Sequence, residues 1–186
     1  MRKLVYGINL SIDGCCDHTK FGGGKEVHDY FTALMEESDL LVYGRITYEL
    51  MSPFWPDLAR STDPDLSPDL RNFAATYAAM DKLVFSRTLQ SVEESNARIV
   101  SAEIEKEIDR LKQMSGKNML LGGVDLPAHL MEAGLVDELH IVIHPVMVGA
   151  GRRLFDGVDL VDKLPVLLHH IRTFADGCVA LVYRKM

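Results

Sequence analysis

Short apolar runs alternate with amphipathic segments along almost the whole chain, and this alternation constrains the fold more than any other feature. The apolar runs predict strands at residues 4–10, 40–43, 82–86, 99–100, 118–121 and 138–144. Between them, apolar residues at helical spacing predict helices at residues 26–37, 44–49, 67–80, 101–116 and through 130–133. Two further apolar runs, 164–174 and 178–184, flank the turn residues Ala175-Asp176-Gly177 and predict a closing hairpin.

Strand and helix in alternation favour a mixed, mostly parallel sheet with helices on both faces, which is a three-layer α/β/α fold. The closing hairpin adds an antiparallel pair of strands at its C-terminal side. Four prolines between residues 53 and 68 predict a long irregular stretch, and a loop of that length is usually functional. No linker or repeat divides residues 1–186, so we expect a single domain.

Charge and cysteine usage narrow the class of protein further. Twenty Lys and Arg against 27 Asp and Glu give a formal charge of −7, which argues against nucleic acid as a partner. No apolar run approaches the length of about 20 residues that a membrane span needs, and no secretory cleavage site follows the first run, so we expect a cytoplasmic protein. Cys15, Cys16 and Cys178 suit neither a disulfide framework nor a metal site, so we expect reduced thiols and no metal.

Three turns at strand ends combine glycine, hydroxyl and cationic residues. They are the Gly-Arg-Ile-Thr turn at 44–47, the Ser-Arg-Thr turn at 86–88 and the Leu-Gly-Gly turn at 121–123. In an open α/β sheet, ligands bind at the carboxyl ends of the strands, where backbone N–H groups and cations hold phosphate. Each turn alone is equally compatible with a plain turn requirement, and the common nucleotide-binding glycine fingerprints are absent. Together they outline a site for a phosphate-rich ligand.

Five segments in chain order carry a resemblance to a known family. They are Asn-Leu-Ser-Ile-Asp-Gly at 9–14, residues 43–49, residues 82–89, the Leu-Gly-Gly turn at 121–123, and the run at 136–155 that contains Gly149, Gly151 and Phe155. The chain resembles the dihydrofolate reductase-like superfamily, and within it the reductase domain of bifunctional riboflavin-biosynthesis proteins. Because the zinc-deaminase motifs of those bifunctional proteins are absent, it resembles a stand-alone reductase.

The resemblance implies an NADPH-dependent reductase with a dihydrofolate reductase-like fold. The residues that it implies at the cofactor are Gly44, Arg45, Thr47, Ser86, Arg87, Gly122 and Gly123. The first turn would hold cofactor phosphates, the second the 2′-phosphate at the adenosine end, and the third would pass close to the diphosphate. Two fixed cations beside the additional phosphate favour NADPH over NADH.

On the substrate side, the resemblance implies that Asn9 lies near the nicotinamide and that Asp13 orients substrate, although Asp13 also fits a simple turn role. The acid that grips the heterocycle in dihydrofolate reductases corresponds to His28 by ungapped spacing and to Asp29 with one gap. We favour Asp29, and His28 is an alternative proton donor. Both also fit the surface of an amphipathic helix. Trp55 is expected as a wall over a flat heterocycle or as a core anchor.

We therefore expect a reductase of a pyrimidine or pteridine-type heterocycle, related to 5-amino-6-(5-phosphoribosylamino)uracil reductase. Dihydrofolate reduction and non-catalytic nucleotide sensing on the same fold are the alternatives. In the resembling domains the C-terminal side of the sheet takes part in subunit contact, so we expect a homodimer.

Overall fold

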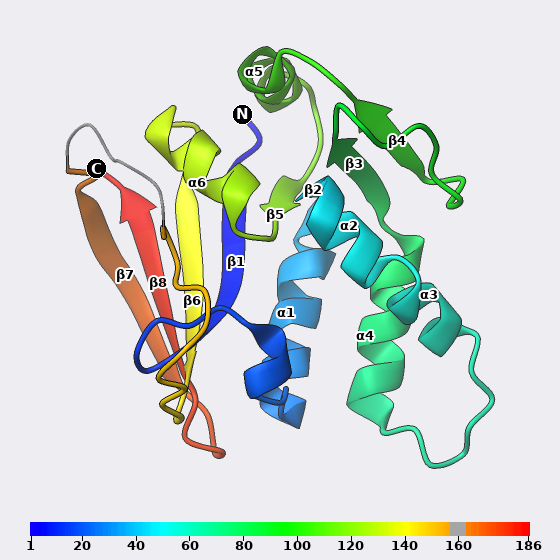
Figure 1. Ribbon diagram of the computed structural model, residues 1–186, viewed down its shortest axis with the longest axis vertical. Helices are drawn as coiled ribbons and strands as arrows, with labels where there is room; N and C mark the ends of the chain where they lie inside the picture. Colours follow the sequence, from blue (N-terminus) through cyan, green and yellow to red (C-terminus); the bar gives the residue numbers. More distant parts are fainter. Residues whose placement is uncertain (157–162) are drawn as a thin grey trace.

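Eight strands form one sheet in the order β4-β3-β2-β5-β1-β6-β8-β7, in a computed structural model that describes residues 1–156 and 163–186 (Figure 1). The strands are β1 (Leu4–Ser11), β2 (Ser38–Gly44), β3 (Asp81–Phe85), β4 (Ala97–Val100), β5 (Asn118–Leu121), β6 (Glu138–His144), β7 (Val166–Thr173) and β8 (Val179–Lys185). The strands from β4 to β6 pair in parallel, whereas β8 is antiparallel to both β6 and β7. The predicted mixed sheet and closing hairpin are confirmed.

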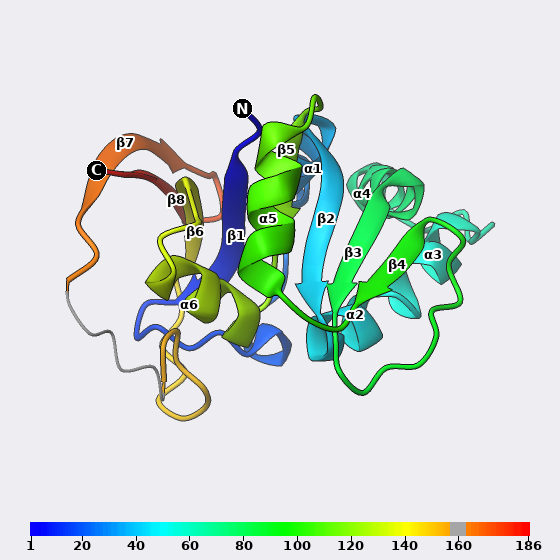
Figure 2. The same cartoon turned by 90° about the horizontal axis from the view of Figure 1, so that it is seen from above.

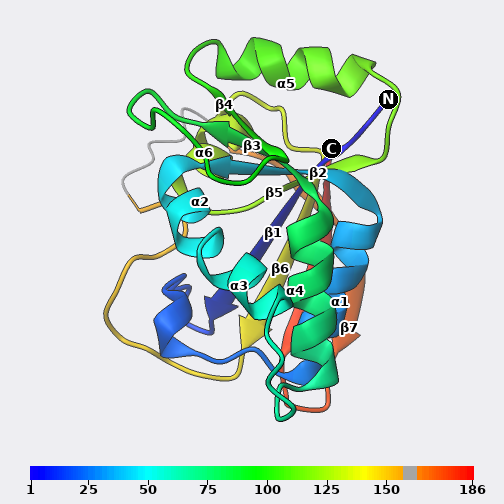
Figure 3. The same cartoon turned by 90° about the vertical axis from the view of Figure 1, so that its right-hand side faces the viewer.

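Helices cover both faces of this sheet, as predicted. They are η1 (His18–Lys20), α1 (Lys25–Glu36), α2 (Arg45–Met51), α3 (Phe54–Ala59), α4 (Pro68–Ala79), α5 (Ile104–Gln113) and α6 (Asp125–Glu132). Figure 3 shows α5 on one side of the sheet and α1 with α4 on the other. Within the described parts of the chain, no helix is long and apolar enough to cross a membrane.

Two apolar cores lie on opposite faces of the sheet because consecutive strand residues point in opposite directions. On one face, Tyr77 of α4 and Leu34 of α1 pack with Leu41 of β2. On the other face, Ile108 of α5 and Leu130 of α6 pack in the core that includes β1 and β5 residues. Each central strand is therefore buried on both faces, which agrees with its nearly continuous apolar sequence.

The proline-rich stretch differs from the prediction in one respect, because it contains the short helix α3. Pro53 is the N-cap residue and Pro56 lies in the first turn, where a missing backbone N–H breaks no intrahelical hydrogen bond. Pro56 is buried, and Trp55 packs against the core beneath α4. Proline here starts a helix instead of preventing one.

Strand β7 is an exposed edge of the sheet. All eight of its residues are exposed, including Leu167, Leu168 and Ile171. Its partner β8 follows a turn in which Phe174 N–H donates to Cys178 O at 2.9 Å, and Gly177 has the left-handed φ of +87° that glycine favours. An exposed edge strand presents backbone N–H and C=O groups with which a strand of another chain can pair.

The central position of β5 generates a stability prediction. Leu121 is fully buried in the core under α5 and α6, so Leu121→Ala should lower the free energy of unfolding by about 3 kcal/mol. The matched control is Leu50, which is 47% exposed on α2. Leu50→Ala should change the free energy of unfolding by less than about 0.5 kcal/mol. Urea unfolding measures both; equal losses would contradict the packing of β5.

Candidate functional site

Three strand-end turns meet at one edge of the sheet. The parallel register places Val42 of β2 opposite Leu121 of β5 and Gly44 of β2 opposite Phe85 of β3. The turns that follow β2, β3 and β5 therefore lie next to one another, at the edge toward which the arrowheads of β2, β3 and β4 point in Figure 2. This is the edge at which open α/β sheets bind ligands.

The turn after β5 packs directly against the start of α2, and only glycine fits there. A Cβ atom on Gly123 would lie 2.3 Å from Thr47 Oγ1, and one on Gly122 would lie 2.7 Å from Tyr43 Cε1. Gly123 also has a φ of +99°, a conformation that side chains disfavour. Tyr6 Oη fixes this turn by donating to Gly123 O at 2.8 Å. The two glycines therefore allow the turn after β5 to pack closely against Tyr43 and Thr47.

The two arginines that the sequence assigns to phosphate differ in their surroundings. Arg45 begins α2, and its Nη1 donates to Glu49 Oε2 at 2.6 Å on the helix surface. Arg87 is exposed after β3 and has no ion pair with any residue of the described ranges. An incoming anion would have to compete with Glu49 for Arg45, whereas Arg87 is available without rearrangement.

A cavity of about 360 Å³ lies beside Arg87. Its walls come from the carboxyl ends of β3 and β4, the first turn of α5, and α6. Ser86 and Arg87 line it together with Glu103, Glu105 and His129. No sequence motif links α5 and α6 to the strand-end turns, so the last three residues could not be predicted from the sequence.

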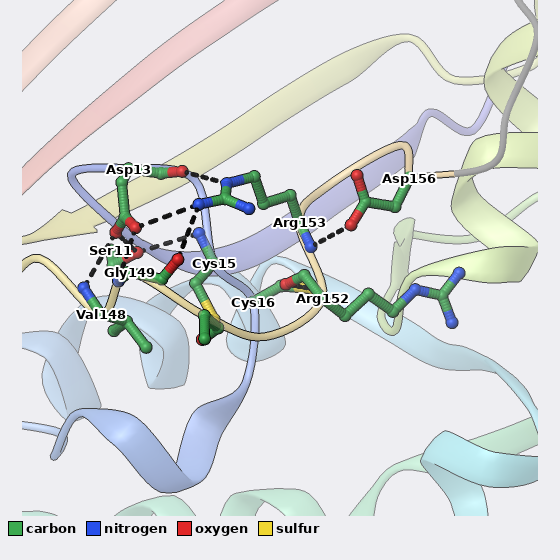
Figure 4. Close-up of polar contacts among 10 residues, drawn as sticks. Ser11, Asp13, Cys15, Cys16, Val148, Gly149, Arg152, Arg153 and Asp156 are labelled. Carbon is green, nitrogen blue, oxygen red and sulfur yellow. Dashed lines mark hydrogen bonds and ion pairs between the residues drawn. The ribbon is translucent and has the colours of Figure 1, made fainter.

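Asp13 is held by the loop after β6 (Figure 4). Its carboxylate accepts hydrogen bonds from Ser11 Oγ at 2.6 Å, Val148 N at 3.1 Å and Gly149 N at 2.9 Å, and Arg153 Nη2 lies at 3.4 Å. The Ser11 hydroxyl, followed by the two backbone N–H groups, holds the pKa of Asp13 well below its usual range. These contacts make Asp13 the anchor of the loop.

The same loop is tied to two other elements. Arg153 forms an antiparallel bridge with Cys15, and Arg152 pairs with Asp125 at the start of α6. A Cβ atom on Gly151 would lie 2.9 Å from Cys15 Sγ, so this crossing is tight. The loop thereby joins the turn after β1 to the helix that follows the Gly-Gly turn.

Asn9 lies on the α1 side of the sheet beside His144. His144 Nε2 lies 2.9 Å from Asn9 Oδ1, and its Nδ1 lies 3.4 Å from Cys178 Sγ. Burial lowers the pKa of His144 and raises that of Cys178 to about 12. The neutral imidazole therefore donates to Asn9 and accepts from the Cys178 thiol, while the Phe21 ring stacks on it at 4.6 Å.

His28 and Asp29 differ sharply in burial. His28 Nδ1 lies 2.7 Å from Asp69 Oδ2 on α4, and the two side chains are only 16% and 9% exposed. Burial alone would raise the pKa of Asp69, but hydrogen bonds with His28 and Ser67 outweigh it and lower the pKa. Asp29 is 41% exposed and pairs with Lys25 on the helix surface. His28 is therefore buried with a partner on α4, whereas Asp29 lies at the helix surface.

Trp55 belongs to the same cluster as His28. Its ring lies 4.4 Å from that of Phe73, which in turn lies 6.0 Å from the His28 imidazole. Trp55 Nε1 donates to Met51 Sδ at 3.3 Å, which fixes the indole. Trp55 and His28 thus belong to one group between α1, α3 and α4, whereas Asn9 lies beside His144 and Asp13 lies at the loop after β6.

The layers, the strand order and the three adjacent turns define a dihydrofolate reductase-like α/β protein. The RibD C-terminal domain family matches residues 2–180, so the chain belongs to this family. The chain is also 31% identical over 181 residues to the uncharacterized protein YyaP of Bacillus subtilis (strain 168), covering 97% of this chain and 87% of YyaP.

Solved structures share the fold. A protein of Shewanella sp. PV-4 ascribed to riboflavin biosynthesis matches with a TM-score of 0.76 and 20% identity, covering 99% of both chains. The diaminohydroxyphosphoribosylaminopyrimidine deaminase/5-amino-6-(5-phosphoribosylamino)uracil reductase of Thermotoga maritima matches with a TM-score of 0.68 and 13% identity. That match covers all of this chain and 57% of the Thermotoga chain. At these identities, the likeness establishes the fold alone.

The close contact between Gly123 and Thr47 generates a second prediction. Gly123→Ala introduces both a disfavoured φ and a clash, whereas Gly14→Ala has a similar φ of +80° with nothing within 4 Å of the new Cβ. Gly14→Ala should cost about 1 kcal/mol of unfolding free energy from backbone strain alone. Gly123→Ala should cost more, as urea unfolding will show. Equal losses would mean that Thr47 does not constrain the turn.

Proposed function

We propose that this protein is an NADPH-dependent reductase of a pyrimidine-type heterocycle. Membership of the RibD C-terminal domain family supports a reductase of this kind, and the Thermotoga relative carries such an activity in its name. The observation that carries the proposal is the convergence of three turns on one edge, where the Gly-Gly turn packs on Thr47 and where Arg87 has no ion pair within the described ranges. The three free cysteines of the protein fit a reducing compartment, which we take to be the cytoplasm.

The residues at the edge fit a nicotinamide dinucleotide. In the proposal, Gly44, Arg45 and Thr47 of the first turn contact the diphosphate, and Gly122 and Gly123 let it approach the backbone. Ser86 and Arg87 bind the adenosine end in the adjoining cavity. The bound cofactor supplies the hydride, and the protein supplies orientation and a proton.

We place the heterocycle on the α1 side of the sheet, between Asn9 and Trp55. The Asn9 amide nitrogen is available for a hydrogen bond because its Oδ1 already accepts from His144. His28 donates the proton in this account. Asp69 occupies Nδ1, which leaves Nε2 as the position that would transfer the proton. Asp13 contributes indirectly by fixing the loop after β6.

Turnover tests this proposal. NADPH oxidation is measured with 5-amino-6-(5-phosphoribosylamino)uracil and, separately, with dihydrofolate. The pyrimidine should be reduced, and His28→Gln should lower kcat about a hundredfold because general acid catalysis contributes on that order. Asp29→Asn should change kcat less than about threefold, because Asp29 pairs with Lys25 on the surface.

Each other outcome decides between the alternatives. A loss in Asp29→Asn equal to that in His28→Gln would make Asp29 the functional acid. Reduction of dihydrofolate alone would identify a dihydrofolate reductase. NADPH binding without reduction of either heterocycle would favour a nucleotide sensor.

We further propose that the protein is a homodimer that pairs through β7. Leu167, Leu168 and Ile171 are exposed on a strand whose outer edge is unpaired in the described ranges. Two copies related by a two-fold axis would pair these edges antiparallel and cover the apolar side chains of both. Apolar residues on an edge strand otherwise favour uncontrolled association.

The dimer makes the fourth prediction. The Ile171 side chain on β7 is 50% exposed, and Ile171→Asp would place a charge in the proposed interface. We expect this variant to be a monomer when its mass is measured by light scattering after size exclusion. Leu50→Asp, which changes a comparably exposed leucine on α2, should leave the dimer intact. A wild-type monomer at micromolar concentration, or an Ile171→Asp dimer, would contradict pairing through β7.

A further inference from the structure

A chain of hydrogen bonds runs from the turn between β7 and β8 to the first strand of the sheet. Cys178 Sγ lies 3.4 Å from His144 Nδ1, and His144 Nε2 lies 2.9 Å from Asn9 Oδ1. Cys178 and His144 are only 3% and 4% exposed, and the Phe21 ring stacks on the imidazole at 4.6 Å. Because water has little access to these two side chains, their polar atoms depend on one another and on Asn9.

The protonation states of the two buried members give this chain one direction. A neutral imidazole carries a single N–H, so one of its nitrogens donates and the other accepts. Burial lowers the pKa of His144, which keeps the ring neutral near pH 7. Burial, followed by the neighbouring Asp176 carboxylate, raises the pKa of Cys178 to about 12, which keeps the thiol protonated. With the thiol donating to Nδ1, the imidazole proton is on Nε2 and is donated to the Asn9 oxygen.

Asn9 lies just beyond the contact between β1 and α1. Gly7, two residues earlier on the same face, packs beneath α1, since a Cβ atom there would lie 3.0 Å from Phe31 Cε1. Ser11, two residues later, is buried and donates to Asp13. Asn9 between them is partly exposed, and within residues 1–156 and 163–186 its amide nitrogen has no hydrogen-bond partner. Asn9 therefore offers N–H donors at this face of β1.

We propose that His144 and Cys178 determine which heterocycles the site accepts, because they hold Asn9 with its N–H groups toward the substrate. This inference rests on the proposed function, which places the heterocycle beside Asn9. An amide that is free to turn over suits either a carbonyl or an amino group, since it can present its oxygen or its nitrogen. With its oxygen held by His144, Asn9 presents donors only. The site thus selects a ring that carries a carbonyl oxygen at this position.

The buried position of the chain makes this selection costly to reverse. An amino group opposite Asn9 would place two sets of N–H donors against each other. Turning the amide over would instead set the Asn9 nitrogen against the N–H of His144 Nε2, where water cannot supply the missing acceptor. We expect a preference of about tenfold or more for the carbonyl. In this account Asn9 contacts the substrate, and His144 and Cys178 are positioning residues.

The tautomer of His144 tests the chain without any ligand. Imidazole ¹⁵N chemical shifts of the purified protein distinguish a proton on Nε2 from one on Nδ1. Near neutral pH, the wild type and Cys178→Ser should carry the proton on Nε2, because a hydroxyl at this position also donates to Nδ1. Cys178→Ala should populate both tautomers. The matched control is Cys15→Ala, which removes another buried thiol, one that contacts Ala150 O, and should leave the tautomer unchanged.

Binding of paired heterocycles tests the consequence for selectivity. Dissociation constants are measured by calorimetry, in the presence of NADP⁺, for 5-amino-6-(5-phosphoribosylamino)uracil and for its counterparts in which either ring carbonyl is replaced by an amino group. The wild type, Cys178→Ser and Cys15→Ala should bind the uracil about tenfold or more tightly than one of the counterparts. Cys178→Ala and His144→Leu should reduce this ratio to less than about threefold, since neither holds the Asn9 oxygen as the wild type does.

The two measurements separate failure of this inference from failure of the proposed function. A wild-type proton on Nδ1 would mean that the thiol donates to Asp176 and that Asn9 turns its oxygen to the site, which overturns the inference alone. Equal binding of the uracil and both counterparts, or a preference that survives in Cys178→Ala and His144→Leu, would also overturn it. If none of the heterocycles binds, the proposed function is wrong and the inference fails with it, whichever tautomer is found.

Discussion

Parallel pairing of β5 between β1 and β2 is the constraint on which the rest of the structure depends. These three strands run in the same direction, so the turns that leave β2 and β5 must lie side by side at one edge. Burial on both faces holds the strands in register, because a one-residue slip would exchange the two cores. The adjacency of Thr47 and Gly123, and with it the nucleotide site we propose, follows from this register.

A second layer of contacts holds the edge in shape. The Asp13 carboxylate binds two backbone N–H groups of the loop after β6, and Arg152 of that loop pairs with Asp125 at the start of α6. The turn after β1 and the helix after the Gly-Gly turn are thereby connected through one loop (Figure 4). Asp13 therefore anchors this loop, which its position in a turn motif alone does not reveal.

Local sequence signals were sufficient for most of the fold. Alternation of strand and helix predicted the layers, and Ala175-Asp176-Gly177 predicted the hairpin, because both depend on residues close in sequence. The helix α3 was missed because prolines indicate irregular structure, although Pro53 and Pro56 occupy positions where they are tolerated. Glycines at strand ends likewise indicated the edge, since close backbone approach demands them.

Contacts between distant helices were beyond the reach of sequence patterns. The pairing of His28 with Asp69 joins α1 to α4, and the cavity joins Arg87 to His129 of α6. None of these residues has a fixed spacing from its partner, so only the packing of helices on the sheet brings them together. Burial then distinguishes His28 from its neighbour Asp29, a distinction that helical periodicity left open.

The central claim is that the edge built by the three turns binds the nucleotide, and amide chemical-shift mapping during titration with NADPH tests it most directly. We predict the largest shifts at Thr47, Arg87, Gly122 and Gly123. The amino-terminal ends of β2 and β3 should be unaffected, including Asp39 and Asp81, which line a second cavity there. Shifts confined to that second cavity, or none at saturating NADPH, would contradict the account.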